Sequence, residues 1–130
     1  MVSIYIAEDN PILLQGLERA LTANGYAVST AEDGEAILNL LRESPPPDFL
    51  LLDVMMPRVT GIEVLDAVRS DPRTAHVPVM LITAAAEEVV PTHILDAHDV
   101  EILTKPFQLK ELLAKIQMHV GGTDQGASPP

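Results

Sequence analysis

The sequence contains no cysteine and few basic residues, and each shortage limits what the protein can be. Without cysteine the chain forms no disulfide, which suits a reducing compartment. A domain of 130 residues buries about two-thirds of the surface that its unfolded chain exposes, so it needs neither a disulfide nor a structural metal to fold. Eight Lys and Arg residues against 19 Asp and Glu residues give a formal net charge of −11. Such an acidic surface repels phosphate backbones, so we expect no direct contact with nucleic acid.

Signals for membrane insertion and export are also missing. The apolar runs, such as residues 77–82, are far too short to span a bilayer. The start of the chain has no basic segment ahead of an apolar stretch, so no signal peptide is expected. These features predict a single cytoplasmic domain that does not contact a membrane.

Short apolar runs alternate five times with segments of helical periodicity, which is typical of an α/β fold with a parallel sheet. The expected strands are residues 2–7, 26–30, 49–52, 79–82 and 101–104. Helix boundaries are marked by capping and breaking residues, namely Asn10-Pro11 and Asn24-Gly25, Asp33, Asp71-Pro72 and Gly121-Gly122. The residues expected to face inward from four helices are Leu13, Leu14, Leu17, Leu21, Ile37, Leu40, Leu41, Val64, Leu65, Val68, Leu109, Leu112, Leu113, Ile116 and Val120.

Two segments need separate treatment. Residues 87–97 have a helical pattern interrupted by Pro91, so we expect a short helix that begins near this proline, or a kinked one. The end of the chain is rich in glycine, serine and proline. We therefore expect one domain over residues 1–120 and a flexible tail or linker remnant over residues 121–130.

Residues with useful chemistry follow four of the expected strands. Glu8 and Asp9 follow the first strand, Asp53 the third, Thr83 the fourth and Lys105 the fifth. The carboxyl ends of parallel strands meet at one edge of a sheet, so these side chains should converge there. Two carboxylates about 4 Å apart repel by about 4 kcal/mol at an effective dielectric near 20, which favours proton uptake or a bound cation. With oxygen ligands only, Mg²⁺ is the natural cation, and the hydroxyl and ammonium suit a phosphoryl group.

These motifs resemble the receiver domain of bacterial two-component response regulators, of the stand-alone CheY-like type. The resemblance is carried by Asp53-Val54-Met55-Met56-Pro57 with Gly61, by Leu81-Ile82-Thr83-Ala84, and by Leu103-Thr104-Lys105-Pro106-Phe107. It extends from Val2 to about Val120. It implies a flavodoxin-like (βα)5 fold, a doubly wound, parallel five-stranded sheet with strand order 2-1-3-4-5.

The resemblance also implies roles for the site residues. Asp53 would accept a phosphoryl group from a sensor histidine kinase or a phosphotransfer protein, and would lose it slowly. Lys105 and Thr83 would stabilise the transferred group. Mg²⁺ would be held by Asp9, Asp53 and the backbone carbonyl of Met55, with Glu8 acting through a water molecule. The protein would catalyse only its own phosphorylation and dephosphorylation.

The implied partners beyond the phosphodonor are a downstream protein or an output domain absent from this sequence. The domain is expected to be a monomer, or a weak homodimer through the fourth helix, fifth strand and fifth helix. Three residues in that region depart from the family pattern: Ile102 replaces the aromatic residue three positions before the lysine, His98 replaces a glycine, and Pro91 interrupts the helix. We hypothesise that the phosphorylation signal is communicated by repositioning of the fourth helix rather than by an aromatic switch.

Two other functions are compatible with parts of the pattern. A pseudo-receiver, which binds partners without being phosphorylated, is favoured by the altered output region and opposed by the complete set of site residues. A metal-dependent hydrolase on a similar scaffold would carry a second aspartate two residues after the nucleophile. Met55 stands at that position, so turnover of external substrates is not expected. The side chains of Met55 and Met56 are instead expected to pack.

Overall fold

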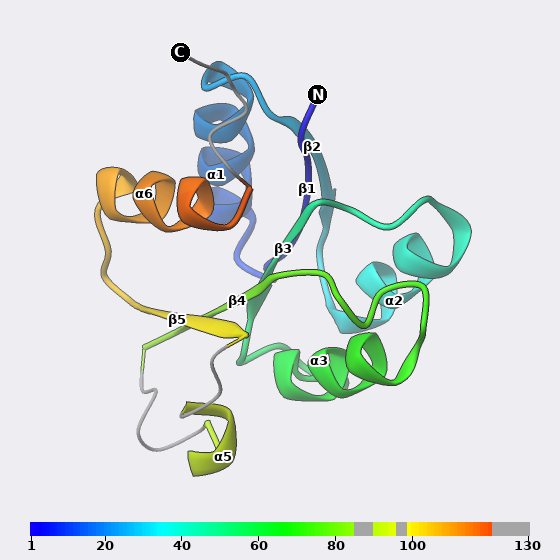
Figure 1. The fold of residues 1–130 in the computed structure, drawn as a ribbon. Helices are drawn as coiled ribbons and strands as arrows, with labels where there is room; N and C mark the ends of the chain where they lie inside the picture. Colours follow the sequence, from blue (N-terminus) through cyan, green and yellow to red (C-terminus); the bar gives the residue numbers. More distant parts are fainter. Residues whose placement is uncertain (85–89, 96–98, 121–130) are drawn as a thin grey trace.

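The computed structural model describes residues 1–84, 90–95 and 99–120, and it has a parallel sheet between two layers of helices (Figure 1). The strands are β1 (Ser3–Ala7), β2 (Ala27–Ala31), β3 (Phe49–Asp53), β4 (Val79–Thr83) and β5 (Val100–Thr104). Their order in the sheet is β2-β1-β3-β4-β5, so the predicted fold class and topology are confirmed. β2 begins one residue later than expected. The N–H of Tyr26 donates to the carbonyl of Leu21 at the end of the preceding helix, and the ladder starts with Ala27.

Local sequence signals account for where the helices begin and end. The helices are α1 (Pro11–Ala23), α2 (Gly34–Glu43), α3 (Gly61–Ser70), α5 (Thr92–Leu95) and α6 (Leu109–Val120). The side chain of Asn10 accepts hydrogen bonds from the first turn of α1, and Asp33 does the same for α2. Thr60 and Glu63 form a reciprocal capping box at the start of α3.

The sheet separates two hydrophobic cores. α1 and α6 cover one face, and α2 and α3 cover the other (Figure 1). Alternate residues of β3 point to opposite faces, so Phe49 and Leu51 pack beneath α1 and α6, whereas Leu50 and Leu52 pack beneath α2 and α3. All five residues of β3 are buried, as expected for a central strand covered on both sides.

The prediction that Leu109 faces the core is wrong. Leu109 is 43% exposed, while α6 buries Leu112 and Ile116. A helical side chain covers the turn that precedes it, and Leu109 is the first residue of α6, so no turn lies beneath it. Leu40 of α2 is half-buried and packs at the margin of its core.

The expectation for Pro91 is met within the described residues. α5 is a single turn that begins directly after this proline, and the carbonyl of Pro91 accepts a hydrogen bond from the N–H of Ile94. The remainder of the predicted helix, residues 87–89 and 96–97, lies outside the described residues. None of the helices in the described ranges has the length and apolar character needed to cross a membrane.

Strand register brings the site residues to one edge of the sheet. Ala7 of β1 pairs with Leu52 of β3, so the residues that follow, Glu8 and Asp53, lie level with each other. Thr83 of β4 pairs with Thr104 of β5, and Lys105 comes next in the chain. Backbone pairing alone therefore aligns the carboxyl ends of β1, β3, β4 and β5.

Candidate functional site

Glu8 and Asp9 occupy the turn between β1 and α1. The side chain of Glu8 is buried, and its Oε2 accepts a hydrogen bond from the backbone N–H of Asn10 at 3.0 Å. The backbone N–H of Glu8 donates to the carbonyl of Ala31 in β2 at 3.1 Å. Asp9 is exposed. The pair thus offers one fixed, buried carboxylate and one that is open to solvent.

Asp53 is the last residue of β3 and is 3% exposed. Its Oδ1 accepts a hydrogen bond from the backbone N–H of Met55 at 3.1 Å. The chain then turns into α3, where the N–H of Gly61 donates to the carbonyl of Val54 at 3.0 Å. A Cβ on Gly61 would lie only 2.4 Å from the carbonyl oxygen of Asp53, so a residue without a side chain is needed for this close approach.

Lys105 lies beside two of the carboxylates. Its Nζ is 3.3 Å from Oε1 of Glu8 and 3.6 Å from Oδ2 of Asp53. The backbone N–H of Lys105 donates to the carbonyl of Thr83 at 2.8 Å, which fixes the start of the loop after β5 against the end of β4. The ammonium is therefore held over the same edge of the sheet as the acidic residues.

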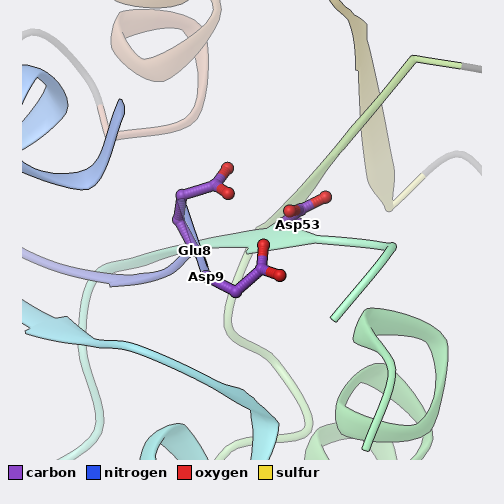
Figure 2. A group of neighbouring side chains, drawn as sticks. All are labelled: Glu8, Asp9 and Asp53. Carbon is purple, nitrogen blue, oxygen red and sulfur yellow. The ribbon is translucent and has the colours of Figure 1, made fainter. Parts of the chain in front are cut away.

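The three carboxylates form a cluster (Figure 2). Glu8, Asp9 and Asp53 each place an oxygen within 4.8 Å of the others. The pKa of Asp53 is raised from 3.8 to about 7, first by burial and then by the Glu8 carboxylate; the Met55 N–H and the Lys105 ammonium only partly offset this. The unbalanced negative charge and the oxygen-only donor set fit a hard divalent cation such as Mg²⁺.

A cavity of about 530 Å³ opens above the cluster. It is lined by the acidic residues and Lys105, and by the side chains of Ile12 and Met55. Ile12 is 82% exposed and Met55 is 60% exposed. The expectation that Met55 packs is therefore wrong, whereas Met56 is buried as expected. The sequence pattern did not single out Ile12, because it lies outside the inward-facing stripe of its helix and a single exposed apolar residue carries no signal for a site.

Thr83 takes its expected place at the end of β4 but is buried rather than exposed to the cavity. Ala84, the next residue, lines the cavity wall. The structure thus brings Glu8, Asp9, Asp53 and Lys105 into one group, while Thr83 is buried at the end of the neighbouring strand β4.

Of the three departures from the family pattern, two lie in the described residues. Ile102 is half-buried and packs against the core beneath α2 and α3, which also includes Val90 and Ile94. Pro91 directly precedes α5. His98 lies outside the described residues.

Together, the topology and the acidic edge define a doubly wound α/β domain with a cluster of three carboxylates at the carboxyl ends of its strands. The family model of the response regulator receiver domain matches residues 4–117. The chain therefore belongs to the response regulator receiver domain family, the receivers of two-component systems. The predicted family is confirmed.

Comparisons with individual proteins agree with this assignment. The chain is 38% identical over 128 residues to the response regulator MprA of Mycolicibacterium vanbaalenii, covering 97% of this chain and 54% of that protein. It thus spans about half the length of the curated relatives it matches. Chemotaxis protein CheY4 of Vibrio cholerae has a TM-score of 0.83 and 27% identity, covering 92% of this chain and 98% of that one.

A third match has a metal in its structure. The receiver domain of a sensor histidine kinase from Pseudomonas aeruginosa has a TM-score of 0.83 and 27% identity, covering 93% of this chain and 98% of that one. That structure has a magnesium ion coordinated in its active site cleft.

Proposed function

We propose that this domain is a phosphoacceptor switch in which Asp53 receives a phosphoryl group from a histidine kinase or a phosphotransfer protein. The observation that carries the proposal is the convergence of Glu8, Asp9 and Asp53 within 4.8 Å of one another, with Lys105 beside two of them. A buried carboxylate held beside a cation-binding cluster has the arrangement required of a nucleophile in phosphoryl transfer.

Each residue has a separate task in this proposal. A carboxylate oxygen of Asp53 attacks phosphorus as the bond to the donor nitrogen breaks, and an acyl phosphate forms. The Met55 N–H holds Oδ1 of Asp53, which leaves the other oxygen for the attack. Lys105 neutralises charge on the transferring oxygens, and the Thr83 hydroxyl donates to one of them after transfer.

Mg²⁺ would be held by Asp9, Asp53 and the Met55 carbonyl, with Glu8 contributing through water, and would neutralise the charge that the phosphoryl group adds. The domain would act only on its own acyl phosphate, because Met55 stands where an external hydrolase would need an acid. The receiver unit would span residues 1–120, with residues 121–130 as a tail or connection. Its signal would pass in the cytoplasm to a downstream protein or an output domain.

Intact-mass analysis tests the proposal. The protein would be incubated with Mg²⁺ and phosphoramidate, beside Asp53→Asn, a chelator-treated sample and the matched surface variant Asp48→Asn. We expect one phosphoryl adduct in the unaltered protein and in Asp48→Asn, and none in the other two. An adduct on Asp53→Asn would contradict the assignment of the acceptor.

The second candidate is a pseudo-receiver that binds partners without phosphorylation. It is favoured by Ile102, which is half-buried and packs against the core at the position where the family carries an aromatic residue. This candidate predicts no adduct and no Mg²⁺ binding by the folded protein, so a calorimetric Mg²⁺ titration distinguishes the two functions.

A further inference from the structure

Arg58 has an unusual backbone conformation close to the site. It lies in the loop between β3 and α3, five residues after Asp53, and its φ is 66°. Residues other than glycine seldom adopt this left-handed conformation, and those that do persist only where the surrounding structure holds them. The loop must therefore be held by specific contacts.

One of these contacts is an ion pair with the start of α2. Nη2 of Arg58 lies 3.0 Å from Oδ2 of Asp33. The other oxygen of Asp33 accepts the backbone N–H of Ala36 at 2.8 Å and so caps α2. Asp33 is 27% exposed and is fixed by its capping bond, whereas Arg58 is 65% exposed. Asp33 thus provides an anchored point to which the loop is tied.

Close packing between the residues that directly follow Asp33 and Arg58 adds to this restraint. A Cβ on Gly34 would lie 2.3 Å from the carbonyl oxygen of Val59 in the same loop. On the other side, Gly61 approaches the backbone of Asp53 equally closely. The loop is thus enclosed between the start of α2 and the end of β3.

The same loop carries Met55, whose N–H orients the Asp53 carboxylate. We propose that Arg58 and Asp33 are positioning residues whose ion pair holds the β3–α3 loop in the orientation that the cation site requires. This inference rests on the proposed function, because the Met55 carbonyl and the Asp53 carboxylate are two of the proposed ligands of Mg²⁺. Neither Arg58 nor Asp33 touches the cation in this proposal.

A simpler electrostatic effect would give a different result. Removing the positive charge of Arg58 near an acidic site would strengthen the binding of a cation through space, and removing the negative charge of Asp33 would weaken it. Loss of a shared restraint would weaken cation binding in both cases. The signs of the two changes therefore separate positioning from through-space charge.

Calorimetric Mg²⁺ titration of variants makes this test. Arg58→Gly removes the ion pair and tolerates a positive φ, and Asp33→Asn removes it and keeps a good helix cap. We expect each to weaken Mg²⁺ binding by about two- to fivefold, the effect of one exposed ion pair, and the double variant to be no weaker than the weaker single variant. Arg58→Lys should bind Mg²⁺ as the unaltered protein does.

A matched control lies away from the site. Oδ1 of Asp71 accepts a hydrogen bond from the backbone N–H of Arg73 at 2.9 Å. Oδ2 of Asp71 lies 3.8 Å from Nη1 of Arg73. Asp71→Asn should leave Mg²⁺ affinity unchanged. In the metal-free protein, the amide resonance of Met55 should shift in Arg58→Gly and stay in place in the control.

Three outcomes would overturn the inference. Tighter binding by Arg58→Gly with weaker binding by Asp33→Asn would assign the effect to through-space charge. Unchanged Mg²⁺ affinity in both variants would show that the loop needs no such restraint, and would leave the proposed function intact. No Mg²⁺ binding by the unaltered, folded protein would overturn the proposed cation site and this inference together.

Discussion

Asp53, a residue that is 3% exposed, places its carboxyl group beside two other carboxylates. Lys105 supplies one positive charge against these three groups. Because a buried charge that is not fully paired disfavours the folded state, the residue proposed for function also reduces stability. Measurements on single-residue variants of the metal-free protein can determine how much stability this charge costs.

The first prediction concerns Asp53→Asn. The pKa of Asp53 is about 7 in the folded protein and ordinarily 3.8, so the folded state binds the proton more tightly than the unfolded state does. The stability linked to this proton is fully present below pH 3.8 and is lost as pH rises through 7. Asp53→Asn, which cannot ionise, should therefore be more stable than the unaltered protein at pH 8 by about 1–3 kcal/mol.

Urea unfolding with a chelator present measures this difference. The gap between the two proteins should narrow as pH falls and vanish near pH 4. Equal stability at pH 8 would show that the Asp53 charge is better compensated than its burial indicates. Asp48→Asn, on the surface, serves as the control for loss of a carboxylate.

The second prediction concerns Lys105→Met. The ammonium lies 3.3 Å and 3.6 Å from two carboxylates and competes with any cation for them. Its removal should tighten Mg²⁺ binding by about fivefold and weaken the binding of beryllofluoride, a phosphoryl mimic, because the mimic loses a positive partner. Calorimetry measures the first change and fluorine NMR the second. Weaker binding of both ligands would indicate that Lys105 maintains the shape of the site instead.

At the scale of helices and strands, two glycines in different helices provide a matched pair for the third prediction. Gly16 lies on the exposed side of α1, and a Cβ there would meet nothing within 4 Å. Gly16→Ala should stabilise the protein by about 0.5–1 kcal/mol, because alanine loses less backbone freedom in a helix. Gly61→Ala would press a methyl group against the Asp53 carbonyl at 2.4 Å and should cost about 2–3 kcal/mol.

Thermal unfolding tests this prediction: the melting temperature should rise in Gly16→Ala and fall in Gly61→Ala. Gly61→Ala should also weaken Mg²⁺ binding, because the clash is with the residue that carries the carboxylate. Gly16→Ala should not. If both variants were destabilised to the same degree, the close approach of α3 to β3 would not be the cause.

Most elements could be predicted from the sequence because their signals are local. The Asn10 cap, the Asp33 cap and the unbroken apolar run of β3 each depend on a few neighbouring residues. The edge position of the site residues followed from the topology of parallel sheets. The predicted family also supplied the strand order, which periodicity alone does not provide.

Features created by contacts between distant segments could not be predicted. The ion pair between Asp33 and Arg58 joins residues 25 positions apart, and nothing in either local sequence marks it. Exposure of Met55 over the cavity and burial of Thr83 depend on how loops lie across the sheet edge. Leu109 matches the helical period, but α6 begins at that residue, so the prediction that its side chain faces the core is wrong.

At the scale of the whole molecule, the formal net charge of −11 affects both the stability of the domain and its attraction for cations. Like charges spread over the surface repel one another and favour expansion of the chain. Arginine and lysine pairs offset part of this locally. Arg69 is an example: its Nε lies 3.2 Å from Oδ2 of Asp99, and its guanidinium also donates to the carbonyls of Ala75, Val77 and Asp99, which ties α3 to the start of β5. General screening by salt and specific binding of Mg²⁺ should therefore both stabilise the domain, through different groups.

The fourth prediction separates these two effects. Raising NaCl from about 0.02 M to about 0.3 M shortens the Debye length to less than 10 Å and should raise the unfolding free energy of every variant. Mg²⁺ at about ten times its dissociation constant should add about 1.4 kcal/mol to the unaltered protein at constant ionic strength. The double variant Asp9→Asn/Asp53→Asn should keep the NaCl response and lose the Mg²⁺ response. If Mg²⁺ stabilised both proteins equally, it would be acting as a general counterion for the acidic surface, and the carboxylate cluster would not be a cation site. Loss of the Mg²⁺ response in the double variant would instead locate the specific part of the effect at the edge where β1 and β3 end.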